Sequence, residues 1–198
     1  MTRTLGIVLF PQVEELDFVG PLEVFGTLAK LGADWRVVTV AEREEPLTGA
    51  NGLKVQPDHS FEDCPPLDVL LVPGGWGTRR ERENPTMLEF VRRTAAGALY
   101  VTSVCTGALV LQAAGLLAGK RATTYWAAMD HLRALGDVEV VNERFVHDGN
   151  VITAAGVSAG IDMALYLVGL VNGADTARAV QKAIEYYPQP PEFAEAGA

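Results

Sequence analysis

Short apolar runs alternate along the chain with longer stretches in which apolar residues recur at helical spacing. The runs predict strands at residues 5–10, 35–41, 68–72, 99–103, 121–124 and 138–141. The stretches predict helices over residues 13–31, from residues 84–85 onward, over residues 106–117, up to about residue 135, and over residues 158–171 and 174–186. Asn51-Gly52 and Asp148-Gly149-Asn150 are hairpin signals. This alternation predicts the α/β class, as a three-layer flavodoxin-like sandwich whose mostly parallel sheet has helices on both faces.

A single domain spanning residues 1–198 is the expected organisation. A chain of 198 residues can bury a core without disulfides or metals, and no internal repeat or Gly/Ser-rich linker divides it. Folds of this class carry their sites at the carboxyl ends of the strands, so candidate residues are sought there.

The chain is acidic, with a formal net charge of −9 from 16 basic and 25 acidic residues. The sequence has no run of Lys or Arg that could contact a phosphate backbone, which argues against nucleic-acid binding. Residues 157–171 are apolar but contain Asp162, and they fall short of the roughly 20 residues that a membrane span needs. Residues 5–10 are too short for the apolar core of a signal peptide. The two cysteines, Cys64 and Cys105, lie in different contexts, so we expect reduced thiols and a cytoplasmic location.

Cys105 lies where the strand at residues 99–103 turns into the helix at residues 106–117. A sharp turn of this kind, a nucleophile elbow, presents one side chain at the top edge of the sheet. The positive end of the helix and its free N–H groups stabilise a thiolate, so the sequence predicts a lowered pKa for this cysteine. A buried structural cysteine explains the spacing equally well, because Cys is among the most buried residue types.

Three carboxylates, Glu14, Glu15 and Asp17, follow the carboxyl end of the first strand and can supply a general acid or base. Asp17 is the favoured candidate because its neighbours Leu16 and Phe18 are apolar and can hold it partly buried. The two glutamates are expected in solvent. An isolated Asp in such a place more often caps a helix or makes a local turn, so capping is the alternative for Asp17.

The strand at residues 68–72 ends in a glycine-rich segment that includes Gly74, Gly75 and Trp76. Glycines let backbone N–H groups approach a ligand, which makes this segment a candidate oxyanion and substrate-binding site, although a tight turn needs the same glycines. Thr106, directly after Cys105, is a secondary catalytic candidate that would hydrogen-bond a reacting atom. The chain has no HxxxH or CxxC spacing and no GxGxxG or Walker pattern, so we expect neither a metal nor another cofactor.

Together these segments resemble the ThiJ/PfpI branch of the class I glutamine amidotransferase-like superfamily, over residues 5–193. The resemblance is carried by residues 10–11, 16–25, 72–75, 103–108, 122–124, 153–156 and 159–162. Within the superfamily the chain is most similar to isocyanide hydratases, down to the tail at residues 185–188. The resemblance implies a homodimer that hydrates an isocyanide, R–N≡C, to an N-formamide without a cofactor.

In the scheme that the resemblance implies, the Cys105 thiolate attacks the terminal carbon and Asp17 supplies the proton. Water then displaces the thiol from the resulting thioimidate. Three aromatic residues, Phe18, Trp76 and Trp126, are expected to provide an apolar setting for an uncharged organic substrate.

Tyr125 stands where many relatives have His, and a Cys-His pair is what peptidase chemistry needs, so peptidase activity is not expected. A second enzymatic hypothesis is a glyoxalase- or deglycase-like protein acting on methylglyoxal, whose members commonly carry Glu at the Asp17 position and a His near the cysteine. A third is a ligand-sensing domain related to AraC-type regulators, although no helix-turn-helix follows here. A fourth is a redox sensor in which a low-pKa, exposed Cys105 is oxidised.

Overall fold

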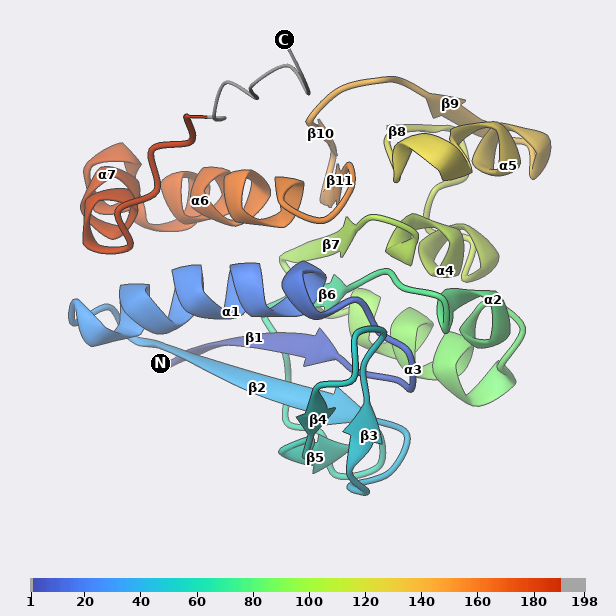
Figure 1. The fold of residues 1–198 in the computed structure, drawn as a ribbon, viewed down its shortest axis with the longest axis horizontal. Coiled ribbons are helices and arrows are strands. Elements are labelled where there is room, and N and C mark those ends of the chain that lie inside the picture. Colours follow the sequence, from blue (N-terminus) through green and yellow to red (C-terminus); the bar gives the residue numbers. More distant parts are fainter. Residues whose placement is uncertain (1, 190–198) are drawn as a thin grey trace, which may run out of the picture.

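A seven-stranded sheet runs through the centre of the protein (Figure 1). The structure is a computed structural model and describes residues 2–189. In spatial order the strands are β10 (Phe145–Asp148), β11 (Val151–Ala154), β7 (Tyr100–Val104), β6 (Val69–Val72), β1 (Arg3–Val8), β2 (Trp35–Ala41) and β5 (His59–Ser60). Neighbouring strands are parallel except β10 and β11, which form the hairpin predicted at residues 148–150. The predicted mostly parallel sheet is confirmed.

Helices cover both faces of this sheet. One layer consists of α1 (Glu15–Lys30), α6 (Ala159–Asn172) and α7 (Ala174–Ala183), and the other of α3 (Pro85–Ala95) and α4 (Gly107–Ala113). The chain moves from β1 to β2 in one direction along the sheet and from β6 to β7 in the other. Because such crossovers are right-handed, the connecting helices α1 and α3 lie on opposite faces. The predicted α/β sandwich is therefore present.

Several short elements surround the carboxyl ends of the strands (Figure 1). They are α2 (Thr78–Glu81), η1 (Trp126–Ala128), α5 (Met129–Ala134), the antiparallel pair β3 (Leu47–Thr48) and β4 (Lys54–Val55), and the parallel pair β8 (Lys120–Ala122) and β9 (Val138–Val140). The β3–β4 pair is the hairpin predicted at Asn51-Gly52. The β8–β9 pair forms a separate small sheet, because its three-residue strands are partly exposed and do not match a central strand buried on both faces.

The differences from the sequence prediction have local causes. The helix predicted over residues 106–117 ends at Ala113, because Gly115 has a φ of +79° and turns the chain out of the helix. The four-residue helix α2 and the two-residue strand β5 were not predicted, since neither is long enough to show a hydrophobic period. Residue 1 and residues 190–198, which belong to the predicted single domain, lie outside the described residues, and so does the end of the resemblance that runs to residue 193.

Close packing between α1 and α6 sets the position of the start of α1. A Cβ on Gly20 would lie 2.9 Å from Cγ1 of Ile161, and one on Gly160 would lie 3.1 Å from Cγ2 of Val104 and 3.4 Å from Cδ of Pro21. The two helices therefore approach each other and β7 at positions without a side chain, which brings the first turns of α1 over the carboxyl ends of the central strands. Within residues 2–189, no helix is long and apolar enough to cross a bilayer.

Candidate active site

Cys105 occupies the turn between β7 and α4, with a φ of +55° and only 6% of its surface exposed. A left-handed backbone is unfavourable for a residue with a side chain, so the surrounding structure must hold it there. The Cys105 N–H donates to the carbonyl oxygens of Ala154 and Ala155, at 3.1 and 2.8 Å. A Cβ on Gly107 would lie 2.1 Å from the carbonyl oxygen of Val72, so only glycine lets α4 begin in direct contact with β6. The predicted sharp turn from strand to helix at Cys105 is thus present.

Asp17 lies in the first turn of α1 and is fully buried. Its Oδ2 accepts a hydrogen bond of 2.8 Å from the N–H of Gly74. Oδ2 of Asp17 and Cβ of Cys105 both lie within 3 Å of the point that a Cβ of residue 74 would occupy, so the glycine allows the two side chains to approach each other. The capping alternative is wrong, because the N-cap of α1 is Glu14 and Asp17 points into the protein interior.

Thr106 connects the elbow to the glycine segment and to α2. Its hydroxyl accepts a hydrogen bond from the N–H of Gly75 at 3.1 Å and can donate to the carbonyl oxygen of Gly75 at 3.2 Å. It also lies 3.0 Å from the hydroxyl of Thr78, the first residue of α2. The Thr106 hydroxyl therefore fixes the position of the glycine segment between β6 and α2. Thr106 also lines a pocket.

The predicted oxyanion site is not a pair of free N–H groups. The N–H of Gly74 donates to Asp17 and the N–H of Gly75 donates to Thr106, so a bound anion would have to compete with both bonds. Gly75 has a φ of +120°, and a Cβ there would lie 2.3 Å from the carbonyl oxygen of Gln12. The two glycines allow the close backbone approach that the tight-turn alternative required, and their oxyanion role stays a prediction.

A pocket of about 370 Å³ lies above the elbow. Cys105, Thr106 and Gly75 line it together with Trp76, whose side chain is 65% exposed, and Tyr125. The walls are largely apolar, with few polar groups, as in sites that bind small organic molecules.

Two of the three aromatic residues expected around the substrate lie elsewhere. Phe18 belongs to the buried core, and Trp126 is 73% exposed beside the pocket-lining Tyr125, with ring centroids 5.6 Å apart. Trp76 is the one that lines the pocket.

Burial, together with the negative charge of Asp17, raises the pKa of the Cys105 thiol to about 12. The N–H and hydroxyl of Thr106 and the N–H of Val157 act in the opposite direction, because hydrogen bonds to the sulfur favour the thiolate. The predicted lowering of this pKa is therefore wrong: α4 has only seven residues, and the loss of solvent outweighs the field of its N-terminus.

Burial also raises the pKa of Asp17, to about 7, and the charge of Glu14 adds to the rise. The N–H of Gly74 and the thiol of Cys105 oppose it by hydrogen bonding to the carboxylate. Cys105 and Asp17 thus form a coupled pair that holds one proton over the range between these two values. In that range the carboxylate is ionised and the thiol is protonated.

Comparison with known proteins places this fold in a family. The model of the DJ-1/PfpI family matches residues 3–170. The chain belongs to the DJ-1/PfpI family. It is 50% identical to an isonitrile hydratase of Pseudomonas putida. The 191 aligned residues cover 96% of this chain and 82% of that relative. The resemblance to the ThiJ/PfpI superfamily is thereby confirmed.

Two further relatives are a family member of known structure and a transcriptional regulator. A crystal structure of a ThiJ/PfpI family protein from Pseudomonas syringae matches with a TM-score of 0.91 at 36% identity, over 99% of this chain and 80% of that one. An HTH-type transcriptional regulator of Pseudomonas aeruginosa is 30% identical over 181 residues, which cover 89% of this chain but only 53% of the regulator. The same DJ-1/PfpI domain is therefore similar both to enzymes and to part of a regulator.

In this family member, six pocket residues were not predicted as site residues: Glu14, Arg79, Tyr125, Ala127, Ala128 and Val157. Glu14 was assigned to solvent, although its charge reaches Asp17. Val157 has a φ of +39°, which is rare for a β-branched residue, and its N–H is directed to the sulfur. No sequence signal marks it, because its role depends on where the start of α6 packs.

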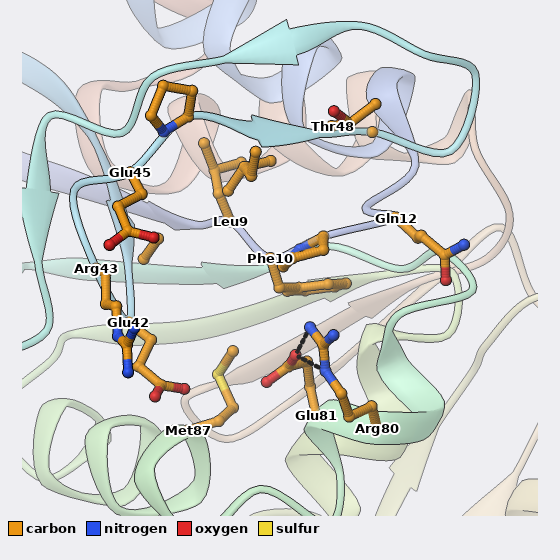
Figure 2. Close-up of a pocket in the computed structure, with 15 residues that line it drawn as sticks. Leu9, Phe10, Gln12, Glu42, Arg43, Glu45, Thr48, Arg80, Glu81 and Met87 are labelled. Atoms are coloured by element: carbon orange, nitrogen blue, oxygen red, sulfur yellow. Dashed lines mark hydrogen bonds and ion pairs between the residues drawn. The ribbon is translucent and has the colours of Figure 1, made fainter.

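Figure 2 shows a second cavity of about 690 Å³ at the carboxyl ends of β1 and β2. Leu9, Phe10 and Met87 form its apolar part, and Arg80 reaches it while paired with the buried carboxylate of Glu81. Neither Cys105 nor Asp17 lines this cavity, so the smaller pocket is the candidate active site of this DJ-1/PfpI domain. Within residues 2–189, no three His, Cys, Asp or Glu side chains are grouped as metal ligands, and both cysteines are free.

Proposed function

We propose that this protein is an isocyanide hydratase, which adds water to R–N≡C and releases the N-formamide R–NH–CHO. The observation that carries the proposal is the pairing of Cys105 with the buried Asp17 at Gly74, beneath a small pocket. The 50% identity to an isonitrile hydratase supports the assignment of this pair to that reaction. No cofactor takes part in the proposed reaction.

In the first step, Asp17 accepts the proton of the Cys105 thiol while the sulfur attacks the terminal carbon of the isocyanide. Asp17 then gives the same proton to that carbon, and the product is the thioimidate R–N=CH–S–Cys. The raised pKa of Cys105 makes Asp17 a base first and an acid second, where the sequence-based scheme began from a thiolate. The N–H groups of Thr106 and Val157 stabilise the charge on sulfur as the proton leaves.

In the second step, water adds to the carbon of the C=N bond. A proton moves to the nitrogen, the C–S bond breaks, and the sulfur regains a proton. One isocyanide and one water thus yield one N-formamide, and the Cys105 thiol and the Asp17 carboxylate are restored. Splitting the addition into two steps is the advantage of a covalent nucleophile.

The competing hypotheses fit the site less well. A redox sensor needs a low-pKa, accessible thiol, whereas Cys105 has a raised pKa and is 6% exposed. Glyoxalase-like chemistry is expected to use a His near the cysteine, and among the described residues that line the pocket Tyr125 is present but no His. The HTH-type regulator is 30% identical to this chain, whereas the isonitrile hydratase is 50% identical.

Two other parts of the proposal are a homodimer and a cytoplasmic location. The family resemblance supports the first, and the two free cysteines support the second. Light scattering of the purified protein tests the dimer, and a mass near 21.2 kDa would contradict it.

The test of function is a spectrophotometric assay with p-nitrophenyl isocyanide, run on the wild type and on Cys105→Ala, with methylglyoxal consumption as the second assay. Formamide production that requires Cys105 supports the hydratase. Consumption of methylglyoxal without hydration of the isocyanide would overturn it in favour of the glyoxalase hypothesis. If the protein consumes neither the isocyanide nor methylglyoxal, a sensing role is favoured.

A further inference from the structure

Two consecutive arginines of α2 face different cavities. Arg80 reaches the larger cavity and is paired with Glu81 (Figure 2). Arg79 lines the active-site pocket, where its Cζ lies 4.1 Å from the centroid of the Trp76 ring. Within residues 2–189 the guanidinium of Arg79 makes no hydrogen bond or ion pair. A positive charge without a counter-ion thus lies at the mouth of the pocket.

Arg79 is the only cation among the described residues that line this pocket. The other ionic side chain there is Glu14, which accepts a hydrogen bond from Nδ2 of Asn51 at 3.2 Å and lies near enough to Asp17 to raise its pKa. The negative charges are therefore on the Asp17 side, and the positive charge is on the Trp76 side. Because the chain as a whole carries a net charge of −9, an anion approaching the pocket needs this local attraction.

The charge of Arg79 is held at a defined place relative to the sulfur. Thr78, which precedes it, lies with its hydroxyl 3.0 Å from that of Thr106, the neighbour of Cys105. Stacking on the indole of Trp76 orders the guanidinium further and leaves its N–H groups free to donate. A substrate with its isocyano carbon at the buried Cys105 can extend its substituent outward, along the exposed Trp76 and toward Arg79.

We propose that Arg79 and Trp76 select isocyanides whose substituent is planar and apolar and ends in a carboxylate. The indole face offers contact to the planar part, and the guanidinium fork binds a carboxylate through two parallel hydrogen bonds. The inference rests on the proposed hydratase function and deepens it by naming the class of substrate.

The experiment compares 4-isocyanobenzoate with its neutral methyl ester, using the wild type, Arg79→Gln, Arg79→Lys and Arg43→Gln. Arg43 is exposed and lines the larger cavity, so its variant removes the same charge away from the pocket. We expect Arg79→Gln to raise the KM of the carboxylate about fivefold, the upper range for a partly exposed ion pair, and to change that of the ester less than twofold. Arg79→Lys should restore part of the loss, and Arg43→Gln should change neither substrate.

A KM for the carboxylate that stays the same in Arg79→Gln, or rises equally for the ester, would overturn the inference while leaving the hydratase in place. If the wild type hydrates neither these compounds nor p-nitrophenyl isocyanide, the proposed function fails, and binding then decides the inference by itself. For that purpose calorimetry measures the Kd of 4-isocyanobenzoate for Cys105→Ala and for Cys105→Ala/Arg79→Gln. A severalfold weaker Kd in the double variant supports carboxylate recognition by Arg79, and equal values refute it.

Discussion

Replacement of Asp17 by Asn should make the protein more tolerant of alkaline conditions while it removes activity. Folding takes the Asp17 carboxyl out of water and raises its pKa from 3.8 to about 7. At 1.36 kcal/mol per pKa unit, ionised Asp17 destabilises the folded state by about 4 kcal/mol, a large part of the 5–15 kcal/mol by which domains are stable.

The sign follows from proton binding. Between pH 3.8 and about 7 the folded state binds the Asp17 proton more tightly than the unfolded state does, so this group lowers the stability as the pH rises. The full loss of stability is reached at pH values above the pKa of Asp17 in the folded state. Asn cannot ionise, so the contribution disappears in the variant.

The measurement is the free energy of unfolding in urea between pH 4 and pH 8.5 for the wild type, Asp17→Asn and Asp130→Asn. The Asp130 side chain is 97% exposed and makes a surface ion pair, so its variant is expected to differ from the wild type by no more than about 1 kcal/mol. We expect the difference between Asp17→Asn and the wild type to grow by about 4 kcal/mol over this range, on the scale used above.

A difference in the free energy of unfolding that is the same at every pH does not report the buried charge. Oδ1 of Asp17 has no hydrogen-bond partner among the described residues, so an Asn amide placed there can change the stability through hydrogen bonding alone. Only the change with pH reports the buried charge. A difference that stays flat from pH 4 to pH 8.5 would refute the raised pKa and the proton transfer that depends on it.

Three other predictions concern the same site. Cys105→Ala should abolish isocyanide turnover with an unchanged circular dichroism spectrum, and persistent turnover would remove the covalent scheme. The value of kcat/KM for a neutral isocyanide should rise with pH through about 7 as Asp17 ionises, and Glu14→Gln should move that inflection to lower pH, because the charge of Glu14 helps to raise the pKa of Asp17. Gly74→Ala should reduce kcat sharply, since its Cβ would lie 2.6–2.8 Å from the N of Thr106, Oδ2 of Asp17 and Cβ of Cys105. Gly26→Ala, with open space around it, should be active and up to about 1 kcal/mol more stable; equal activities of the two glycine variants would contradict the close packing.

The parts of this protein that sequence reasoning found are those with local signals. The buried strands, the hairpins and the elbow at Cys105 follow from runs of apolar residues and from glycines that few other residues can replace. Asp17 was found because apolar neighbours on a helix indicate burial. These signals lie within a few residues of the feature that they predict.

The parts that were missed depend on contacts between distant segments. The pKa of Cys105 is set by its burial and by Asp17, 88 positions earlier in the sequence, so the local helix field gave the wrong direction. The N–H groups of Gly74 and Gly75 each donate to a side chain from another element, which the glycine pattern alone does not indicate. That Arg79 and Arg80 line different cavities depends on a four-residue helix that has no sequence period.

The raised pKa of Cys105 suits the proposed reaction better than a stable thiolate would. Addition of a thiol to an isocyanide places both the sulfur and the proton on one carbon, so the proton has to be delivered close to the sulfur that it leaves. A carboxylate that lies against the thiol and shares one proton with it meets this requirement, whereas a preformed thiolate would need a separate acid at the same place. Burial, which raises both pKa values, keeps that single proton between Cys105 and Asp17 near neutral pH. The stability lost by burying Asp17 is therefore a consequence of the same arrangement that supports the chemistry.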